Sequence, residues 1–269
     1  MSDRDYVLGT QDEEIDRLGL QHRVWRPRVL DAFGRAGIVP GQTVLDVGAG
    51  PGFAACDIAE IVGPQGRVIA LERSRRFLDA LEVRARGLGL GNIDAREQDV
   101  SETGFGVAVA DAAWCRWVLS FVADPRRTFG HIARALKPGG VAIFHEYADY
   151  GGWKMLPPNA EQERFRSLVM QSWRDAGGEP DIGAFLPGWA AEEGLELVEA
   201  RPLVEIAGRS SYVWQWPAAF MAVNAGRLAE LGYIEAEEAA RLATVFDRAP
   251  ADALTVTPLV LELIVRRKG

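Results

Sequence analysis

Residues 44–53 read VLDVGAGPGF, and this stretch decides the fold. The apolar run around Asp46 predicts a short β-strand, and the alternate glycines Gly48, Gly50 and Gly52 predict a tight loop that lets a ligand approach the backbone. A dinucleotide-binding loop needs its third glycine three positions after the second, where this chain has Phe53. The loop therefore favours a small cofactor other than a dinucleotide.

Three acidic residues follow successive predicted strands. The Asp46 carboxylate would repel a pyrophosphate but attract an amino group or a sulfonium. Glu72 ends the next strand, where an acid can accept hydrogen bonds from both hydroxyls of a ribose. Asp99, in EQDV, ends the third strand, where its carboxylate can accept from the exocyclic amine of an adenine. These strand ends offer sites for three parts of one cofactor.

The fold class follows from an alternation of short β-branched runs with amphipathic helices between residues 43 and 147. This pattern is typical of an α/β protein with a parallel sheet. We expect helices to begin near Gly52, Ser74 and Pro125, with Gly139-Gly140 marking a stop before the fifth strand. The five strands are expected at 43–47, 67–71, 93–98, 110–115 and 140–147.

The two ends of the chain carry further elements. Residues 11–37 have helical spacing, but Pro27 predicts a split into two short helices. Downstream, helices are expected at 161–176 and within 214–247, and strands at 195–206 and 259–266. No repeat or linker isolates either end, so one catalytic domain with helical additions is predicted.

Composition excludes several functional classes. The chain has 269 residues and a formal net charge of -8, with basic residues mostly scattered, so nucleic acid is a poor candidate partner. Cys56 and Cys115 cannot build a disulfide framework, and the polar, acidic N-terminus is unlike a signal peptide. No apolar stretch approaches the roughly 20 residues that span a bilayer. We therefore expect a cytoplasmic protein without a membrane segment.

The motifs together resemble the class I S-adenosylmethionine-dependent methyltransferases. The resemblance covers about residues 40–147 and rests on VLDVGAGPG, the acid in ALERS, EQDV, CRWVLSFVADP and LKPGG, in this order. It implies a Rossmann-like methyltransferase fold with a seven-stranded, mostly parallel sheet, helices on both faces, and an antiparallel last strand pair. The long segment between these last strands, at about 208–256, then becomes a helical insertion that forms a lid over the acceptor.

The resemblance also implies a set of cofactor-binding residues. Residues 1–39 would form a helical segment that covers the cofactor, and residues 40–269 the methyltransferase domain. S-adenosylmethionine, with S-adenosylhomocysteine as product, would contact the glycine loop, the strand-end acids with their neighbours, the strand-end pair Arg116-Trp117, and the N-terminal segment. These candidates are Tyr6, Gln21, Asp46, Gly48, Ala49, Gly50, Gly52, Glu72, Arg73, Asp99, Val100, Arg116 and Trp117.

His145 is the candidate general base. The fifth predicted strand delivers it to the carboxyl edge of the sheet, and a histidine can take a proton from a phenol or hydroxyl near neutral pH. His22 and His131 are weaker candidates, better explained as structural residues. The fourth strand ends in Arg116 instead of clustered carboxylates, so no metal is expected.

The acceptor is predicted to be a small organic molecule. CRWVLSF stands where amino-methylating nucleic-acid enzymes carry an N/D-P-P-aromatic tetrad, which disfavours that class. Trp153, Trp173, Trp189, Trp214 and Trp216 lie beyond the fifth strand and suggest an aromatic or apolar acceptor pocket. Methylation on oxygen is mildly preferred over nitrogen or carbon because of His145, and the oligomeric state stays open between monomer and homodimer.

Two other classes remain as alternatives. One is a protein that binds S-adenosylmethionine without catalysis or without methyl transfer. The other is an NAD- or FAD-dependent oxidoreductase. Phe53 disfavours this class, because it stands where a dinucleotide-binding loop has its third glycine.

Overall fold

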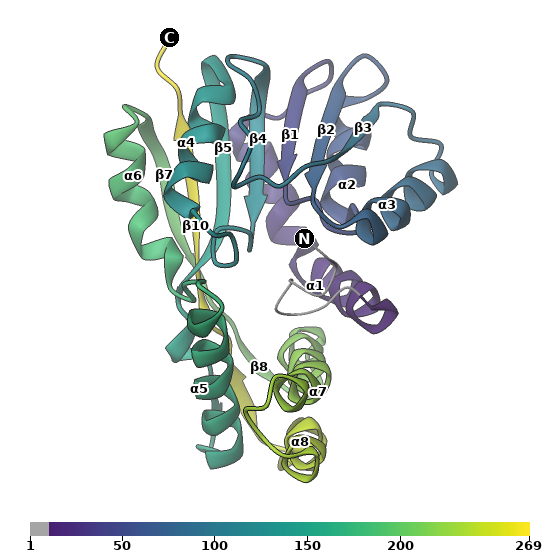
Figure 1. The fold of residues 1–269 in the computed structure, drawn as a ribbon, viewed down its shortest axis with the longest axis vertical. Helices are drawn as coiled ribbons and strands as arrows, with labels where there is room; N and C mark the ends of the chain where they lie inside the picture. The colour runs from purple at the N-terminus through teal and green to yellow at the C-terminus, as the bar shows by residue number, and fades with distance from the viewer. Residues whose placement is uncertain (1–10) are drawn as a thin grey trace.

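The computed structural model describes residues 11–269, and its centre is a seven-stranded sheet in the order β3-β2-β1-β4-β5-β10-β7 (Figure 1). Strands β1 to β5 are parallel, whereas β10 is antiparallel to both of its neighbours, β5 and β7. The predicted Rossmann-like methyltransferase fold and its antiparallel strand pair are confirmed. The strands are β1 (Thr43–Val47), β2 (Arg67–Glu72), β3 (Ile93–Glu97), β4 (Ala110–Arg116), β5 (Leu136–Asp149), β7 (Glu196–Leu203) and β10 (Leu259–Arg266).

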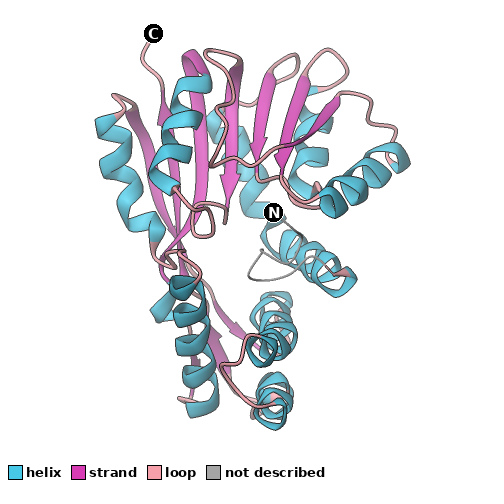
Figure 2. Cartoon of the chain, viewed as in Figure 1, coloured by secondary structure: helices cyan, strands magenta, loops and turns pink. Residues whose placement is uncertain are grey.

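Helices cover both faces of this sheet (Figure 2). Alternate strand residues point to opposite faces, so Val44 joins one buried core while Leu45 joins the other. The first core packs against α1 and α2, and the second packs against α4 and α6. These and the adjoining helix are α1 (Asp12–Ala36), α2 (Phe53–Val62), α3 (Arg75–Gly87), α4 (Pro125–Ala135) and α6 (Leu186–Glu192).

The helix N-termini predicted from the sequence are confirmed at three helices. Gly52 is the N-cap residue of α2, and the Ser74 side chain accepts from the Phe77 amide at the start of α3. Pro125 occupies the first turn of α4, where its missing N–H costs no helical hydrogen bond. Strand β5 begins earlier than predicted, at Leu136, because Gly139 takes a positive φ of 79° and lets the strand continue through an irregularity instead of stopping there.

The prediction that Pro27 splits the N-terminal helix is wrong. A single helix, α1, runs through Pro27, which lies inside it. Proline removes one helical hydrogen bond and costs about 3 kcal/mol in a helix interior. Trp25 and Val29, on either side, are 2% and 0% exposed in the first core, and this apolar burial offsets the cost.

A second unit lies below the carboxyl edge of the sheet (Figure 1). It combines a small antiparallel sheet in the order β6-β9-β8 with helices that come from two separate parts of the chain. The sequence predicted its helices but not this small sheet. The elements are β6 (Lys154–Leu156), α5 (Ala160–Asp175), β8 (Ile206–Gly208), α7 (Gln215–Glu230), α8 (Ala236–Ala243), α9 (Val245–Arg248) and β9 (Leu254–Val256).

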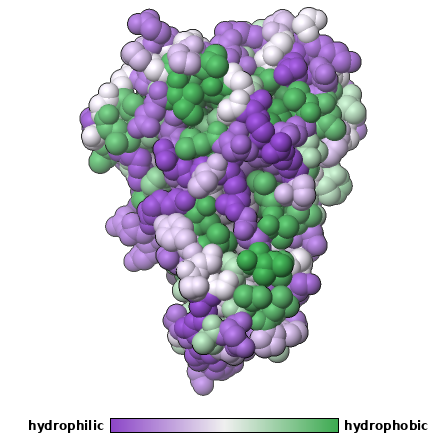
Figure 3. Space-filling model, turned by 180° about the vertical axis from the view of Figure 1, so that it is seen from behind, coloured by the Kyte–Doolittle hydropathy of each residue, from purple (hydrophilic) through white to green (hydrophobic). Residues whose placement is uncertain are grey.

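The surface is mixed in polarity. Seen from behind, several apolar areas are separated by hydrophilic ones, and one of them lies on the narrower lower part of the molecule (Figure 3). Within residues 11–269, the helices are all too short or too polar to cross a bilayer.

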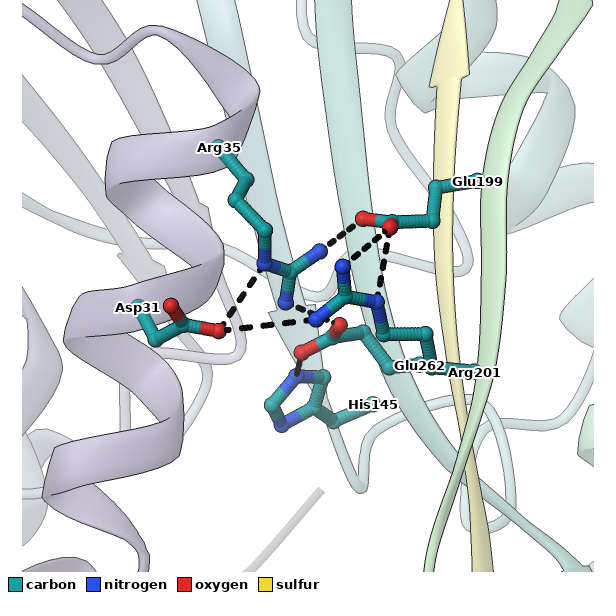
Figure 4. A network of polar contacts seen from close by, with 6 residues as sticks. All are labelled: Asp31, Arg35, His145, Glu199, Arg201 and Glu262. Carbon is teal, nitrogen blue, oxygen red and sulfur yellow. Dashed lines mark hydrogen bonds and ion pairs between the residues drawn. The ribbon is translucent and has the colours of Figure 1, made fainter.

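A polar network joins α1 to the antiparallel end of the sheet (Figure 4). Arg35 of α1 forms ion pairs with Glu199 of β7 and Glu262 of β10. The second oxygen of Glu262, Oε2, lies 2.9 Å from Nε2 of His145, which belongs to β5. Because the Glu262 side chain is 1% exposed, its carboxylate depends on Arg35 for compensation of its charge and on His145 for a second hydrogen bond.

We expect Glu262→Leu to lower the free energy of unfolding by about 3 kcal/mol, because it leaves the buried His145 and the half-buried Arg35 without their shared acceptor. Urea denaturation followed by circular dichroism measures this loss. The control is Asp31→Asn, at a network position whose side chain is 60% exposed, where a loss below about 1 kcal/mol is expected. Equal losses in the two variants would show that burial of Glu262 is not the cause.

Candidate functional site

One cavity of about 660 Å³ brings the predicted cofactor residues together. It lies at the carboxyl edge of the parallel strands and is also bordered by α1 and α7. Of the predicted cofactor residues, the following line it: Gln21, Asp46, Gly48, Ala49, Gly50, Glu72, Arg73, Asp99, Val100, Arg116 and Trp117. Tyr6 lies outside the described residues.

The glycine loop has the conformation that its sequence requires. Gly48 and Gly52 have φ values of 68° and 78°, which L side chains rarely adopt. A Cβ atom would lie 2.4 Å from Val118 at Gly48 and 2.3 Å from Leu81 at Gly52. Gly52 does not line the cavity, so its contribution is the close packing of the loop against α3.

Glu72 fixes the loop from the neighbouring strand. Its Oε2 accepts from the Gly50 amide at 3.0 Å, and its Oε1 accepts from the Ser74 amide at 2.9 Å. Burial raises the pKa of Glu72, while these amides act in the opposite direction. A carboxylate oxygen can accept more than one hydrogen bond, so Glu72 can hold the loop and still accept from a ligand hydroxyl.

Asp46 is a buried acid with one oxygen that lacks a hydrogen-bond partner among the described residues. It is 2% exposed, and its Oδ2 has no hydrogen-bond partner in the described part of the chain. Burial raises its pKa to about 7; Arg116 acts to lower the pKa and Glu72 to raise it. A cationic ligand group at this point would supply the missing partner and favour the ionised carboxylate.

Arg116 places a positive charge on the same cavity. Its Nη1 atom is buried and has no partner among the described residues, whereas Nη2 lies 3.3 Å from Nδ1 of His22. Burial lowers the pKa of Arg116 to about 10, against the opposing effect of Asp46, so the guanidinium is charged at neutral pH. An acid and a guanidinium that each have one atom without a hydrogen-bond partner suit a ligand with an amino group and a carboxylate.

Asp99 and Val100 form the cavity wall that follows β3. The Oδ1 atom of Asp99 accepts from the amide of Ser101 at 2.9 Å and from its hydroxyl at 2.6 Å. This turn fixes the acid where it lines the cavity. Val100 is 6% exposed and adds an apolar surface suited to a flat ring.

Aromatic side chains line the other part of the cavity. Trp117 has a φ of 51°, an uncommon value for a non-glycine residue. Its ring stacks on Tyr147 with centroids 5.4 Å apart and on Trp216 at 5.8 Å. Phe121, Trp173 and Phe220 complete this wall. Of the downstream tryptophans only Trp173 lines the cavity. Trp153, Trp214 and Trp216 belong to the same buried core as Trp173 but do not reach the cavity, and Trp189 packs against Phe129 of α4.

Gln21 connects α1 to the second unit. Its Oε1 accepts from Nη1 of Arg17 and from Nε1 of Trp216, both at 2.9 Å. Arg17 in turn pairs with Glu14 at 2.6 Å. Gln21 lines the cavity as predicted, but its oxygen is committed to holding α1 against α7.

His145 does not have the environment expected of a base. It is 0% exposed, and it is absent from the cavity lining. Its Nε2 faces Glu262, and burial lowers its pKa despite that hydrogen bond. The strand does end at the site, but the side chain of His145 points into the core beneath α1, where it contacts Trp25 and Trp114. The geometry does not support a direct contact between His145 and an acceptor.

Glu146 is a site-forming residue that the sequence interpretation missed. Its Oε1 accepts from the amides of Val118 and Leu119 at 2.9 and 3.0 Å, so it holds the loop that follows Trp117. Burial raises its pKa to about 7, although these amides favour the ionised form. The available signal was an acid two residues after the apolar run 141–144, in a position that should be buried.

Within residues 11–269, no group of three or more histidine, cysteine, aspartate or glutamate side chains is arranged to hold a metal ion.

Comparisons with known proteins agree with this geometry. Residues 45–144 match the protein family described as "Methyltransferase domain". The ubiquinone/menaquinone biosynthesis C-methyltransferase UbiE of Vibrio campbellii is 30% identical over 128 residues, 47% of this chain and 48% of that protein. The chain thus spans about half the length, or less, of the first curated relatives that it matches.

Solved structures show the same fold. A putative methyltransferase from Bacillus halodurans aligns with 90% of this chain and 99% of its own, at 14% identity and a TM-score of 0.63. The [4+2]-cyclase SpnF aligns with 90% of this chain and 81% of its own, at 19% identity and a TM-score of 0.58. At these identities the likeness concerns the fold alone.

We expect wild-type protein to lose stability relative to Glu146→Gln as the pH rises. The folded-state pKa of Glu146 is about 7 and its ordinary value is 4.5, so the folded state binds the proton more tightly. The resulting stabilisation is full below pH 4.5 and is lost as the pH rises through about 7, a change of roughly 3 kcal/mol. Urea denaturation of both proteins between about pH 5 and 8 measures it. Parallel stability curves for the two proteins would contradict the raised pKa of Glu146.

Proposed function

We propose that this chain is a class I S-adenosylmethionine-dependent methyltransferase. Its residues 45–144 match a methyltransferase domain, and in our proposal it transfers a methyl group from S-adenosylmethionine to a small organic acceptor. The observation that carries the proposal is the pair Asp46 and Arg116, each with one buried atom that lacks a hydrogen-bond partner among the described residues, on a cavity that Glu72 and Asp99 also line. Each of these groups matches a part of that cofactor.

The residues present fit the cofactor. In our proposal Asp46 accepts from the α-amino group and Arg116 donates to the α-carboxylate, which gives Oδ2 and Nη1 the partners that they lack. Glu72 accepts from the ribose hydroxyls, and Asp99 and Val100 bind the adenine. The bound cofactor supplies a methyl carbon already activated by its sulfonium. The protein must therefore mainly align the acceptor and exclude water.

The acceptor is proposed to be a planar, aromatic or apolar molecule. Trp117, Tyr147 and Trp173 offer flat or apolar surfaces on one side of the cavity. We also propose that the helical insertion at 208–256 acts as the lid over this acceptor, since Phe220 of α7 lines the cavity.

We propose methylation on oxygen, with carbon as the second candidate because curated relatives are C-methyltransferases. The acceptor oxygen forms a bond to the methyl carbon as the carbon–sulfur bond breaks, S-adenosylhomocysteine is left, and the hydroxyl proton passes to a base or to water. The earlier candidate for this base, His145, stays a prediction without geometric support. Tyr147 is the neighbouring side chain that does line the cavity, and it lies near enough to Arg116 to affect the pKa of that residue.

A second candidate is an S-adenosylmethionine-binding protein that does not transfer the methyl group. The same fold is found in SpnF, whose name is that of a cyclase. An NAD- or FAD-dependent oxidoreductase is less suitable, because Asp46 would repel a pyrophosphate at the glycine loop. Incubation of the protein with methyl-labelled cofactor and phenolic acceptors, followed by mass spectrometry, separates transfer from binding alone.

We expect Asp46→Asn and Arg116→Gln each to weaken S-adenosylhomocysteine binding at least about tenfold, because each removes one charge-assisted hydrogen bond. Isothermal titration calorimetry at about pH 8, where Asp46 is ionised, measures this loss. The control is Asp79→Asn on α3, whose side chain is 63% exposed and pairs with Arg75 outside the cavity. Wild-type affinity in both Asp46→Asn and Arg116→Gln would contradict the assignment of the cofactor site.

We expect Trp173→Leu to raise the KM for the acceptor roughly tenfold while cofactor affinity stays within about twofold, since its ring borders the aromatic part of the cavity. Steady-state kinetics with any acceptor that the mass-spectrometric screen identifies measures the change. Trp189→Leu, on the opposite face of the sheet, is the matched control. A loss of cofactor affinity in Trp173→Leu with no change in acceptor KM would contradict the assignment of the aromatic part of the cavity to the acceptor.

A further inference from the structure

A chain of polar contacts reaches the cavity from outside it. Asp57 of α2 lies 3.0 Å from Nε2 of His22, which belongs to α1. On the other side of the same ring, Nδ1 lies 3.3 Å from Nη2 of Arg116, at the end of β4. His22 and Asp57 do not line the cavity, whereas Arg116 does. The contacts therefore join three separate elements at the one arginine of β4.

The chemistry of these groups fixes the histidine tautomer. A guanidinium can only donate, so Nδ1 of His22 must accept with its lone pair. The ring proton then resides on Nε2 and is donated to the Asp57 carboxylate. Arg26 also donates to Asp57, at 3.0 Å. Only the neutral form of His22 with this tautomer makes both contacts.

The surroundings of His22 favour that neutral form. The ring is buried and stacks on Phe53 with centroids 5.6 Å apart. Burial lowers the pKa of His22 and outweighs the hydrogen bond to Asp57; the charges that face the ring are those of Arg116, Asp57 and Arg26. Burial alone would raise the pKa of Asp57, but hydrogen bonds from His22 and Arg26 lower it. Asp57 is thus ionised over the pH range in which His22 is neutral, and it can accept the Nε2 proton throughout that range.

We propose that His22, oriented by Asp57, is a positioning residue that holds the Arg116 guanidinium by Nη2 and leaves Nη1 for the carboxylate of the bound cofactor. This inference rests on the proposed function. Without an acceptor at Nδ1 of His22, the Arg116 side chain would populate several rotamers in the free protein. Cofactor binding would then have to restrict them to one, at a cost in conformational entropy. His22 restricts them before the ligand arrives.

The arrangement makes cofactor binding sensitive to acid. Protonation of His22 converts Nδ1 from an acceptor to a donor, so the contact with Arg116 is lost and two positive charges lie side by side. Because the pKa of His22 is lowered below 6.5, this loss occurs only as the pH falls below that value. Asp46 titrates at about 7 and also affects binding, so the effect of His22 must be read as a difference between variants.

The test compares His22→Phe, which keeps the ring stack on Phe53 but has no acceptor, with His22→Asn, which keeps an acceptor near the position of Nδ1. Titration calorimetry with S-adenosylhomocysteine at about pH 8 should show roughly tenfold weaker binding by His22→Phe and binding within about threefold of wild type by His22→Asn. As the pH falls below 6.5, wild type should lose affinity more steeply than His22→Asn, which has no group to protonate at this position.

The control is Arg23→Gln, which removes a contact of α1 with Tyr212 but none with Arg116, and should bind as wild type does. Thermal unfolding of each protein shows whether it folds. If His22→Phe does not fold, the pH comparison with His22→Asn decides. Wild-type affinity in a folded His22→Phe, or equal pH profiles for wild type and His22→Asn, would overturn the positioning role. Failure of wild type itself to bind would instead overturn the proposed function.

Discussion

Buried carboxylates that accept backbone amides shape both loops of the cavity. Glu72 of β2 holds the Gly50 amide of the loop after β1, and Glu146 of β5 holds the Val118 and Leu119 amides of the loop after β4. Each acid lies on a strand next to the one whose loop it holds. The parallel order of β2, β1, β4 and β5 therefore brings the acids and the loops to one edge. The rest of the site depends on these two carboxylates, because they fix the loop that contains Gly50 and the loop that follows Trp117.

Helix α1 ties the site to the remainder of the chain. Its N-terminal part carries Gln21 against Trp216 of α7, and its C-terminal part carries Arg35 against Glu262 and Glu199. His22 lies between these contacts and faces Arg116. A helix split at Pro27 would not transmit the position of one end to the other. The uninterrupted helix allows the sheet edge, the cavity and the second unit to share one rigid element.

The acceptor part of the cavity is assembled from distant segments. Trp117 follows β4, Tyr147 belongs to β5, Trp173 to α5 and Phe220 to α7. Their stacking and edge contacts make a flat-walled space next to the charged part at Asp46 and Arg116. This combination underlies our proposal of a planar acceptor beside a zwitterionic cofactor end. Of these four residues, Tyr147, Trp173 and Phe220 lie outside the family match over residues 45–144, and Trp117 lies within it.

The sequence by itself determined the parallel sheet, the glycine loop and the acids Asp46, Glu72 and Asp99, because these depend on local strand and turn chemistry in chain order. It could not determine which side chains reach the cavity. His145 and Tyr147 share one strand and are two residues apart, yet only Tyr147 lines the cavity. Long-range partners decided this outcome. Glu262 of β10 and Trp25 of α1 enclose His145 in the core, and burial of Trp25 and Val29 overrides the local preference of Pro27. Tertiary packing therefore decides which of the locally possible conformations is adopted, because most of the free energy of burial comes from contacts between distant segments.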